Sequence, residues 1–458
     1  MYLQQWSSRM KRRDFLRYGG KFAGAGVLSS LWPTIGSTGE VTKAYPDELL
    51  SIEAYTRGKI KEGDYITVDN VSLVKDLLDP AKYKQVVELG RKLKVVPTTT
   101  DWMKMGPWEY QEATLSNQGK ARFDKRGNVV NQDGKPWIGG HPFPYGQTAL
   151  ELFAGLTLSW GRHDANVYAM KEYDLNSGGV IDYNYDLVWA EMSPVGRTVL
   201  DPKPYWTRHM DKLRFNTVVY TSPDSERGSS YLSVWNYDQN KLPELYGYVP
   251  YFRRIRQFPT NQRFEPLVPG SALYLSDAWA AGDPLHTWGN YKVVGRQTML
   301  AGVSDGWNPH HQNWEHGVHG GPKGESFFDS VVEMIPEVIV CEAEPTGFKR
   351  APISKKRVWF DVRNQMPIAM VTYDRAGKPF RSFDGCYCMF EKDGYKVMDG
   401  SHPYWSWAYF HAYEFQTGRL TRVEHVKELK GGHKSSVNDN SVYRKYLTHT
   451  ALSRLGRV

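Results

Sequence analysis

Cysteine is scarce in this chain of 458 residues, which contains only Cys341, Cys386 and Cys388. Three cysteines are too few for a disulfide framework, and a chain of this length can bury a core without one. Cys386 and Cys388 would share a face of a strand, so either could pair with Cys341 in an oxidising compartment. Three buried free thiols are the alternative. The pattern Cys-x-x-Cys-His is absent, so we expect no covalently bound haem.

A hydrophobic run long enough to cross a membrane is also lacking in the N-terminal region. The apolar stretch at residues 22–32 is shorter than the roughly 20 residues that a spanning helix needs. It follows Arg12, Arg13, Phe15 and Leu16, an order typical of a twin-arginine export signal. We therefore expect residues 1–39 to be a leader, either cleaved before Glu40 or retained, that sends a folded protein to the periplasm. A basic amphipathic start of a cytosolic protein is the alternative.

Charge of one sign is not concentrated beyond this leader. Residues 1–39 carry +5 of the total formal charge of +8, which leaves +3 for the remainder. Nucleic-acid binding requires a dense basic face, so we expect no nucleic-acid partner. Nucleophile elbows, phosphate loops and dinucleotide fingerprints are absent as well. The sequence therefore indicates no catalytic residue and no cofactor.

Strand patterns dominate the remainder of the chain. From about residue 168, short runs of Tyr, Trp, Val and Phe alternate with turns, and residues 357–373 have the pattern of a hairpin. Two helices are predicted, one from Asp79-Pro80 to Pro97 and one over 147–158. We expect a mainly β (α+β) protein with an N-terminal helical segment at 40–100 and one large β-rich domain at 101–458.

One expected strand is rich in rings. If residues 404–415 are a regular strand, its alternation places six ring side chains on one face. Such a face is typical of sheet core, and it can also line a cavity for a hydrophobic ligand. The six candidates for lining a ligand site are Trp405, Trp407, Tyr409, His411, Tyr413 and Phe415.

A histidine-rich segment at 308–319 is a second candidate site. Imidazole and carboxylate groups suit Zn²⁺ or a similar ion, although the Gly, Pro and Asn residues around them favour a solvated loop. The spacing matches no helical His-Glu-x-x-His motif, so we assign no metal. A metal-dependent periplasmic enzyme is kept as an alternative, and its candidate ligands are His311, Glu315, His316 and His319.

Three arginines, Arg253, Arg254 and Arg256, follow an aromatic run at 245–252. Their guanidinium groups could bind lipid phosphate, a carboxylated ligand or a partner protein, which would allow peripheral membrane contact. A solvated or ion-paired strand edge is the simpler interpretation.

Several segments together carry a family resemblance. They are 134–140 (GKPWIGG), 158–162 (LSWGR), 245–250 (LYGYVP), 253–256 (RRIR), 288–291 (WGNY) and 295–296 (GR). With the paired arginines, they resemble a family of exported bacterial proteins of unknown function that is linked by similarity to outer-membrane lipoprotein-sorting carriers.

This resemblance implies a large, curved, antiparallel half-barrel sheet with a few covering helices, whose concave face holds acyl chains. It also implies partners, namely resistance-nodulation-division type exporters and outer-membrane proteins. The chain is far longer than the simple carriers, with insertions such as 310–324. We therefore expect a periplasmic carrier of a lipid or other hydrophobic compound, accessory to an envelope export system. A scaffold of an export complex that binds no small molecule is a further alternative.

Overall fold

The computed structural model describes residues 45–159, 161–260, 263–266, 268–277, 283–391 and 402–457. The expected leader, with Arg12, Arg13, Phe15 and Leu16, lies outside the described residues. In the part of the chain that is described, no helix is both long enough and apolar enough to cross a membrane.

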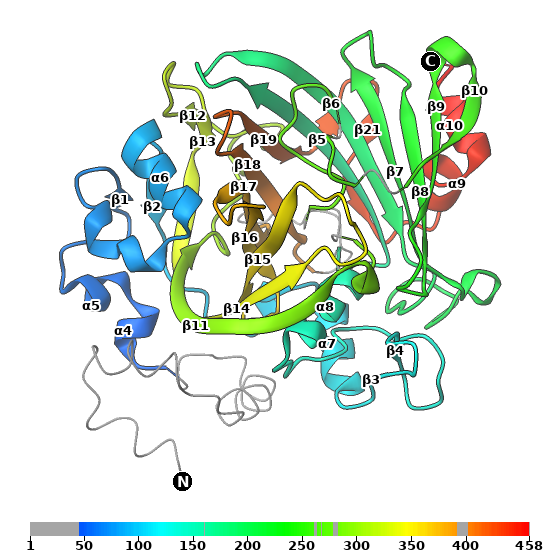
Figure 1. Ribbon diagram of the computed structural model, residues 1–458, viewed down its shortest axis with the longest axis horizontal. Helices are drawn as coiled ribbons and strands as arrows, with labels where there is room; N and C mark the ends of the chain where they lie inside the picture. Colours follow the sequence, from blue (N-terminus) through cyan, green and yellow to red (C-terminus); the bar gives the residue numbers. More distant parts are fainter. Residues whose placement is uncertain are drawn as a thin grey trace.

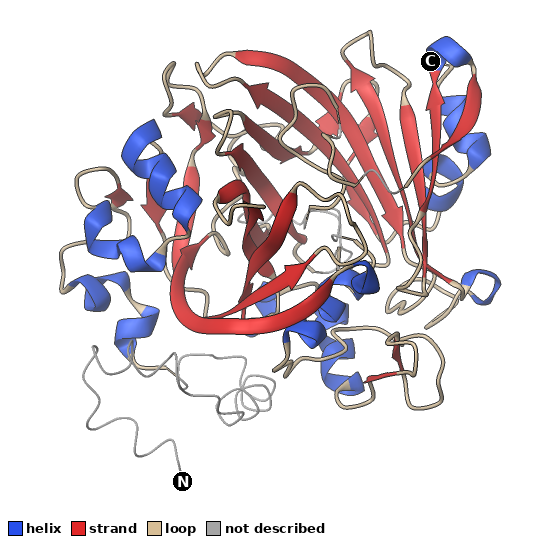
Figure 2. Cartoon of the chain, viewed as in Figure 1, coloured by secondary structure: helices blue, strands red, loops and turns tan. Residues whose placement is uncertain are grey.

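One curved sheet of 16 strands organises the molecule (Figures 1 and 2). Its path runs β1-β2-β14-β15-β16-β17-β18-β19-β5-β6-β7-β8-β9-β10, while β11 pairs with β14 and β22 with β5. The β2–β14 pair is parallel. The strands are β1 (Tyr65–Ile66), β2 (Leu93–Val95), β5 (Ala165–Leu175), β6 (Ile181–Met192), β7 (Lys212–Ser222), β8 (Ser230–Asn236), β9 (Glu244–Val249), β10 (Arg254–Phe258), β11 (Gly289–Ala301), β14 (Ser330–Glu344), β15 (Ile353–Asp361), β16 (Pro367–Asp374), β17 (Pro379–Met389), β18 (Trp405–Glu414), β19 (Leu420–Val426) and β22 (Ser436–Val437).

Short elements surround this sheet. Three small two-stranded sheets pair β3 (Arg122–Phe123) with β4 (Val129–Val130), β12 (Val318–His319) with β13 (Phe327–Phe328), and β20 (Glu428–Leu429) with β21 (His433–Lys434). The α-helices are α4 (Asp47–Leu50), α5 (Ile52–Thr56), α6 (Pro80–Leu89), α7 (Trp108–Asn117), α8 (Ala149–Leu158), α9 (Val442–Tyr446) and α10 (His449–Leu455). The predicted mainly β class, with an open antiparallel sheet and a few covering helices, is confirmed.

The local signals explain where the predicted helices begin. The Asp79 carboxylate accepts hydrogen bonds from the N–H groups of the first turn of α6, and proline occupies the first helical position. Gly90 then ends α6 in the left-handed conformation, with φ of 68°, so the predicted end at Pro97 is wrong. A capping box formed by Thr148 and Glu151 starts α8. The segment predicted as helical also contains β1 and β2, which extend the main sheet.

The core shows which face of the sheet is concave. Residues from β5, β6 and β7 share one hydrophobic cluster with residues from β11 and β14–β18, although these strands lie far apart in the sheet order. The sheet therefore curves around this cluster. Separate clusters cover the opposite, convex face, where α9 packs near β5–β7 and the N-terminal helices pack near β11 and β14. The three cysteines are buried free thiols, with Cys341 in the concave cluster and the other two on the convex side of β17.

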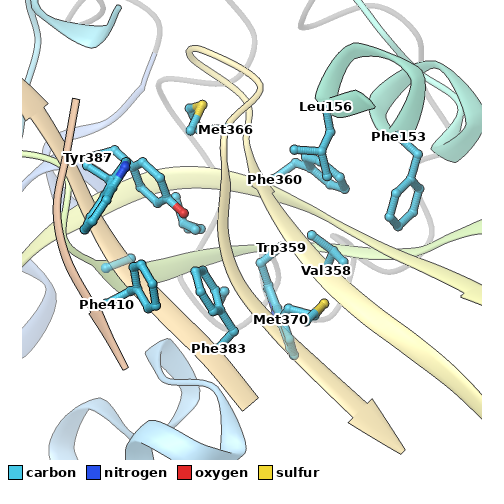
Figure 3. Close-up of a cluster of buried hydrophobic side chains, with 14 of the residues drawn as sticks. Phe153, Leu156, Val358, Trp359, Phe360, Met366, Met370, Phe383, Tyr387 and Phe410 are labelled. Atoms are coloured by element: carbon cyan, nitrogen blue, oxygen red, sulfur yellow. The ribbon is translucent and has the colours of Figure 1, made fainter. Parts of the chain in front are cut away.

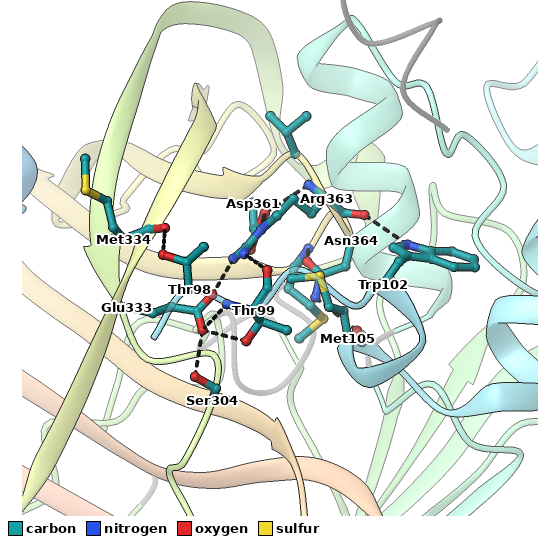
Figure 4. Close-up of polar contacts among 12 residues, drawn as sticks. Thr98, Thr99, Trp102, Met105, Ser304, Glu333, Met334, Asp361, Arg363 and Asn364 are labelled. Atoms are coloured by element: carbon teal, nitrogen blue, oxygen red, sulfur yellow. Dashed lines mark hydrogen bonds and ion pairs between the residues drawn. The ribbon is translucent and has the colours of Figure 1, made fainter. Parts of the chain in front are cut away.

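A buried ionic network attaches the segment before α7 to the sheet (Figure 4). Arg363, in the turn between β15 and β16, pairs with Asp361 at 2.6 Å and with Glu333 of β14 at 2.8 Å. Glu333 also accepts hydrogen bonds from Thr99 and Ser304. Because each ion is paired and hydrogen-bonded, the network is satisfied despite its burial. The network fixes the segment before α7 at one side of the concave face.

Candidate ligand-binding site

The aromatic strand β18 contains an irregularity that divides its rings between two faces. Tyr387 of β17 pairs with Trp407, but its neighbour Cys386 pairs with Tyr409, so Ala408 is an extra residue. Such a β-bulge reverses the alternation of the side chains that follow it. Trp405 and Trp407 consequently lie in the concave cluster, whereas Tyr409 lies in a convex one. The prediction that all six rings share a face is wrong for this reason.

The convex rings have structural partners. The Tyr409 hydroxyl accepts a hydrogen bond from Val331 N–H at 2.9 Å, and His411 Nε2 accepts one from Phe328 N–H at 3.1 Å. Burial lowers the pKa of His411, and nearby Arg91 lowers it further. Tyr413 is buried in another convex cluster, where Phe415, beyond the end of β18, packs against it. These four rings support β13 and neighbouring segments instead of facing the concave side.

Helix α8 covers the concave side of the sheet. Its sequence ALELFAGLTL is apolar on almost every side, and seven of its ten residues are buried. The Phe153 ring packs edge-on against Phe360 at 5.3 Å, and Figure 3 shows Phe153 and Leu156 beside the concave side chains of β15. A helix that is hydrophobic all round requires apolar surroundings. The concave face supplies these surroundings.

A polar pocket lies at the rim of this face, where the end of α8 and the segment before β5 meet β6 and β7. Its wall includes Tyr110 of α7, the segments 139–140, 158–159 and 161–164, Glu191 of β6, and Arg214 of β7. Two of the segments that carry the family resemblance, 134–140 and 158–162, thus meet here. We define these lining residues as the rim pocket. It has room for roughly three water molecules.

Two buried arginines dominate the rim pocket. The Arg162 guanidinium lies between the rings of Tyr110 and Trp405, at 5.1 and 5.5 Å from their centroids. Arg214 lies 4.9 Å from the centroid of Trp235. Burial lowers the pKa of both arginines, that of Arg214 to about 10, so both remain cationic at neutral pH. Trp405 therefore connects the concave aromatic surface to the rim pocket.

Sequence reasoning did not identify Arg162, Arg214 or Glu191 as site residues. Arg162 belongs to the segment 158–162, and the family resemblance of this segment is the sequence signal that could have identified it as a site residue. Arg214 lies in a strand pattern that resembles any solvated edge, and it is buried where it contacts Thr157 of α8 and the ring of Trp235. Glu191 is buried too, and burial raises the pKa of its carboxyl.

The histidine-rich segment does not converge on one point. Glu315 pairs with Lys171 at 2.7 Å, His316 with Glu424 at 3.3 Å, and His319 with Asp329 at 3.2 Å. His311 Nδ1 accepts hydrogen bonds from backbone N–H groups of its own loop. Among the described residues, no group of three His, Cys, Asp or Glu side chains is arranged to hold a metal ion.

The predicted arginine cluster lies at an exposed edge. Arg254 and Arg256 belong to the edge strand β10, and Arg253 precedes it with φ of 50°. All three are exposed, as are the rings of Tyr251 and Phe252. The Arg256 guanidinium covers the Phe252 ring at 4.2 Å. Helix α10 packs against the same end of the sheet and adds the exposed Arg454, so this edge combines rings with positive charge.

Residues 65–453 match the family described as "Protein of unknown function (DUF1329)". The chain belongs to the DUF1329 family. This confirms the family expected from the sequence segments. No curated protein matches the chain.

Solved structures with similarity to this DUF1329 chain share little sequence with it. A DUF1329 protein from Desulfovibrio piger is 12% identical, covers 66% of this chain and 97% of its own, and has a TM-score of 0.42. A domain assigned to outer membrane lipoprotein-sorting proteins, from Vibrio parahaemolyticus, is 14% identical, with coverage of 67% and 98% and a TM-score of 0.39. A LolA superfamily protein from Nitrosomonas europaea is 14% identical, with coverage of 62% and 96% and a TM-score of 0.33. Since these scores lie below 0.5, the fold described above rests on the strand pairing of this chain itself.

Proposed function

We propose that this protein is a periplasmic carrier that shields a lipid or another hydrophobic molecule on the concave face of its sheet. The observation that carries the proposal is that the cover on this face is an apolar helix, α8, which takes no part in the strand pairing of the sheet. Displacing α8 would expose the apolar side chains that it covers, such as Phe360 of β15, and leave the strand pairing intact. Trp405 and Trp407 would then line the ligand.

Burial of apolar surface accounts for the affinity that such a carrier needs. At about 25 cal/mol per Å², covering roughly 300 Å² of an acyl chain is worth about 7.5 kcal/mol before ordering costs. Moving α8 offsets part of this gain, which leaves binding reversible. A reversible carrier can pass its ligand to a partner with a better site, and the expected exporter or outer-membrane protein is the partner class we propose.

The test uses the wild-type protein and two tryptophan variants. Lipid extraction from protein purified from the periplasm, followed by mass spectrometry, should yield a bound hydrophobic compound. Trp407→Ala should reduce binding of the neutral probe N-phenylnaphthylamine. Trp314→Ala is the matched control, because Trp314 is also buried but lies in a convex cluster. Both variants should lose about 3–5 kcal/mol of stability. Empty wild-type protein that binds no probe, or equal binding losses in the two variants, would contradict the proposal.

The basic edge is the proposed membrane contact. Vesicles that contain phosphatidylglycerol should sediment the protein, whereas pure phosphatidylcholine vesicles should not. Arg254→Ala should weaken this binding about fivefold, since a basic residue near an anionic surface contributes about 1 kcal/mol. Arg122→Ala, at an exposed position on β3, is the control. Binding that is insensitive both to Arg254→Ala and to added salt would remove this role.

A further inference from the structure

The rim pocket contains hydrogen-bond donors that lack acceptors. Arg162 donates from Nη2 to Asn364 O and, at 3.4 Å, from Nη1 to Met105 O, while its Nε is buried without a partner in the part of the chain that the structure describes. Arg214 donates from Nη2 to Thr157 O at 2.6 Å, and its Nε is also buried without a partner among the described residues. A buried donor without an acceptor costs about 1–3 kcal/mol, and more when it is charged. The two guanidinium groups therefore favour an acceptor-rich guest.

Among the described residues, the carboxylates of the rim pocket accept their hydrogen bonds from other groups and none from the two arginines, although the charge of Glu191 stabilises the Arg214 cation. Glu191 Oε1 accepts from Asn166 Nδ2 at 3.0 Å and Oε2 accepts from Trp189 Nε1 at 3.2 Å. Asp164 accepts from the backbone N–H groups of residues 198–200 at 2.7–3.1 Å. The unpaired groups of the two arginines are thus cationic donors, and the complementary guest is an oxyanion.

The backbone around Arg162 is held in a conformation that side chains rarely adopt. Arg162 has φ of 59°, in the left-handed region, although it is not glycine. A Cβ atom on its neighbour Gly161 would lie 2.3 Å from Glu191 Oε1, so a larger residue there would displace the Glu191 side chain. Strain of this kind costs about 1–3 kcal/mol and persists where the surroundings fix it. Here it presents the Arg162 guanidinium beside Trp405.

We infer that the rim pocket binds the anionic head group, a carboxylate or a phosphate monoester, of the molecule carried on the concave face. The inference rests on the proposed carrier function and names its ligand class as an anionic amphiphile. Space for a few water molecules suits such a head group and excludes an acyl chain. The alkyl chain of the ligand would leave the rim pocket past Trp405, which lies beside Arg162 of the rim pocket and belongs to the concave cluster.

Three probes with the same alkyl chain test the inference, namely dodecanoate, dodecyl phosphate and dodecanol. Calorimetry on the full-length protein should show that one or both anions bind at least tenfold more tightly than dodecanol. Arg214→Gln should abolish this preference without abolishing dodecanol binding, whereas Arg214→Lys should restore part of it. Arg227→Gln, at an exposed site, should leave the preference unchanged.

A measurement on the wild-type protein covers the case in which Arg214 variants do not fold. The carboxyl carbon of bound ¹³C-labelled dodecanoate should titrate with a pKa about 1–3 units below that of the free acid, as expected beside a cation. Equal affinity for the three probes with an unshifted carboxyl pKa would overturn the head-group inference and leave the carrier function intact. Absence of binding by all three would overturn both. Competition by inorganic phosphate as strong as that by dodecyl phosphate would reassign the rim pocket to a free anion and overturn the inference.

Discussion

Two buried carboxyl groups predict an unusual pH dependence of stability. Glu172 and Asp174 alternate on β5, so they share its concave face. Ser271 Oγ donates to Glu172 Oε1 at 2.7 Å, and the Thr421 hydroxyl donates to Asp174. Burial raises the pKa of both carboxyls, and the charge of Glu172 raises that of Asp174 further. The folded protein therefore retains protons that the unfolded chain releases at lower pH.

The sign of the effect follows from this difference. A carboxyl whose folded pKa is raised stabilises the fold fully below its unfolded pKa, about 4, and this stability is lost as pH rises toward the folded pKa. For each retained proton, the free energy of unfolding falls by about 1.4 kcal/mol per pH unit. One proton would account for a loss of about 4 kcal/mol between pH 5 and pH 8. Arg419 is the cation that opposes the shift at Asp174, and Tyr185 and Tyr220 are the rings that face the pair.

Urea denaturation between pH 5 and pH 9 measures this slope. The double variant E172Q/D174N carries amides that do not titrate, so the stability of the wild type relative to it should fall as pH rises and level off at the folded pKa. Glu112→Gln, at an exposed site on α7, should give a curve parallel to that of the wild type. Parallel curves for the wild type and the double variant would refute the reasoning, because the pair would then release its protons as readily as the unfolded chain.

Two further substitutions test the covering role of α8 and the ionic network around Arg363. Phe153→Ala should remove the ring that α8 packs against the sheet, lower the free energy of unfolding by about 3–5 kcal/mol and accelerate N-phenylnaphthylamine uptake in stopped-flow measurements. Uptake at the wild-type rate would contradict a covering role. Arg363→Met should leave Asp361 and Glu333 buried without their cation and cost about 3–5 kcal/mol in urea denaturation. Arg350→Met, at an exposed site, should cost less than about 0.5 kcal/mol. Equal losses of stability in the two variants would contradict the stabilising role of the ionic network.

The fold class was predictable because its signals are local. The hairpin predicted for 357–373 corresponds to β15 and β16, since alternating apolar residues and a turn at 363–365 determine it within one segment. The caps of α6 and α8 are local as well, and both helices begin within two residues of their predicted starts. The parallel pairing of β2 with β14 was not predictable, because it joins residues far apart in the chain.

The aromatic face shows how one residue defeats a periodic pattern. A period of two assigned the six rings to one side, but the extra residue Ala408 reversed the assignment from Tyr409 onward. Nothing in the residue types distinguishes a bulge there, because the pairing strand β17 determines the register. The candidate ligand surface therefore keeps Trp405 and Trp407 and loses the rings that follow them.

The glycines of the rim pocket show why the resemblance segments gather there. A Cβ on Gly140 would lie 2.3 Å from Thr114 N, and one on Gly139 would lie 2.8 Å from Thr198 Cγ2. Both glycines also have positive φ, of 74° and 118°, which larger residues rarely adopt. Segments 134–140 and 158–162 thus need their glycines to form one closely packed wall around the two buried arginines. Hydrophobic strands tolerate exchange among apolar residues of similar size, whereas this wall does not. The ligand class of the protein should accordingly depend more on the rim pocket than on the apolar side chains of the concave face.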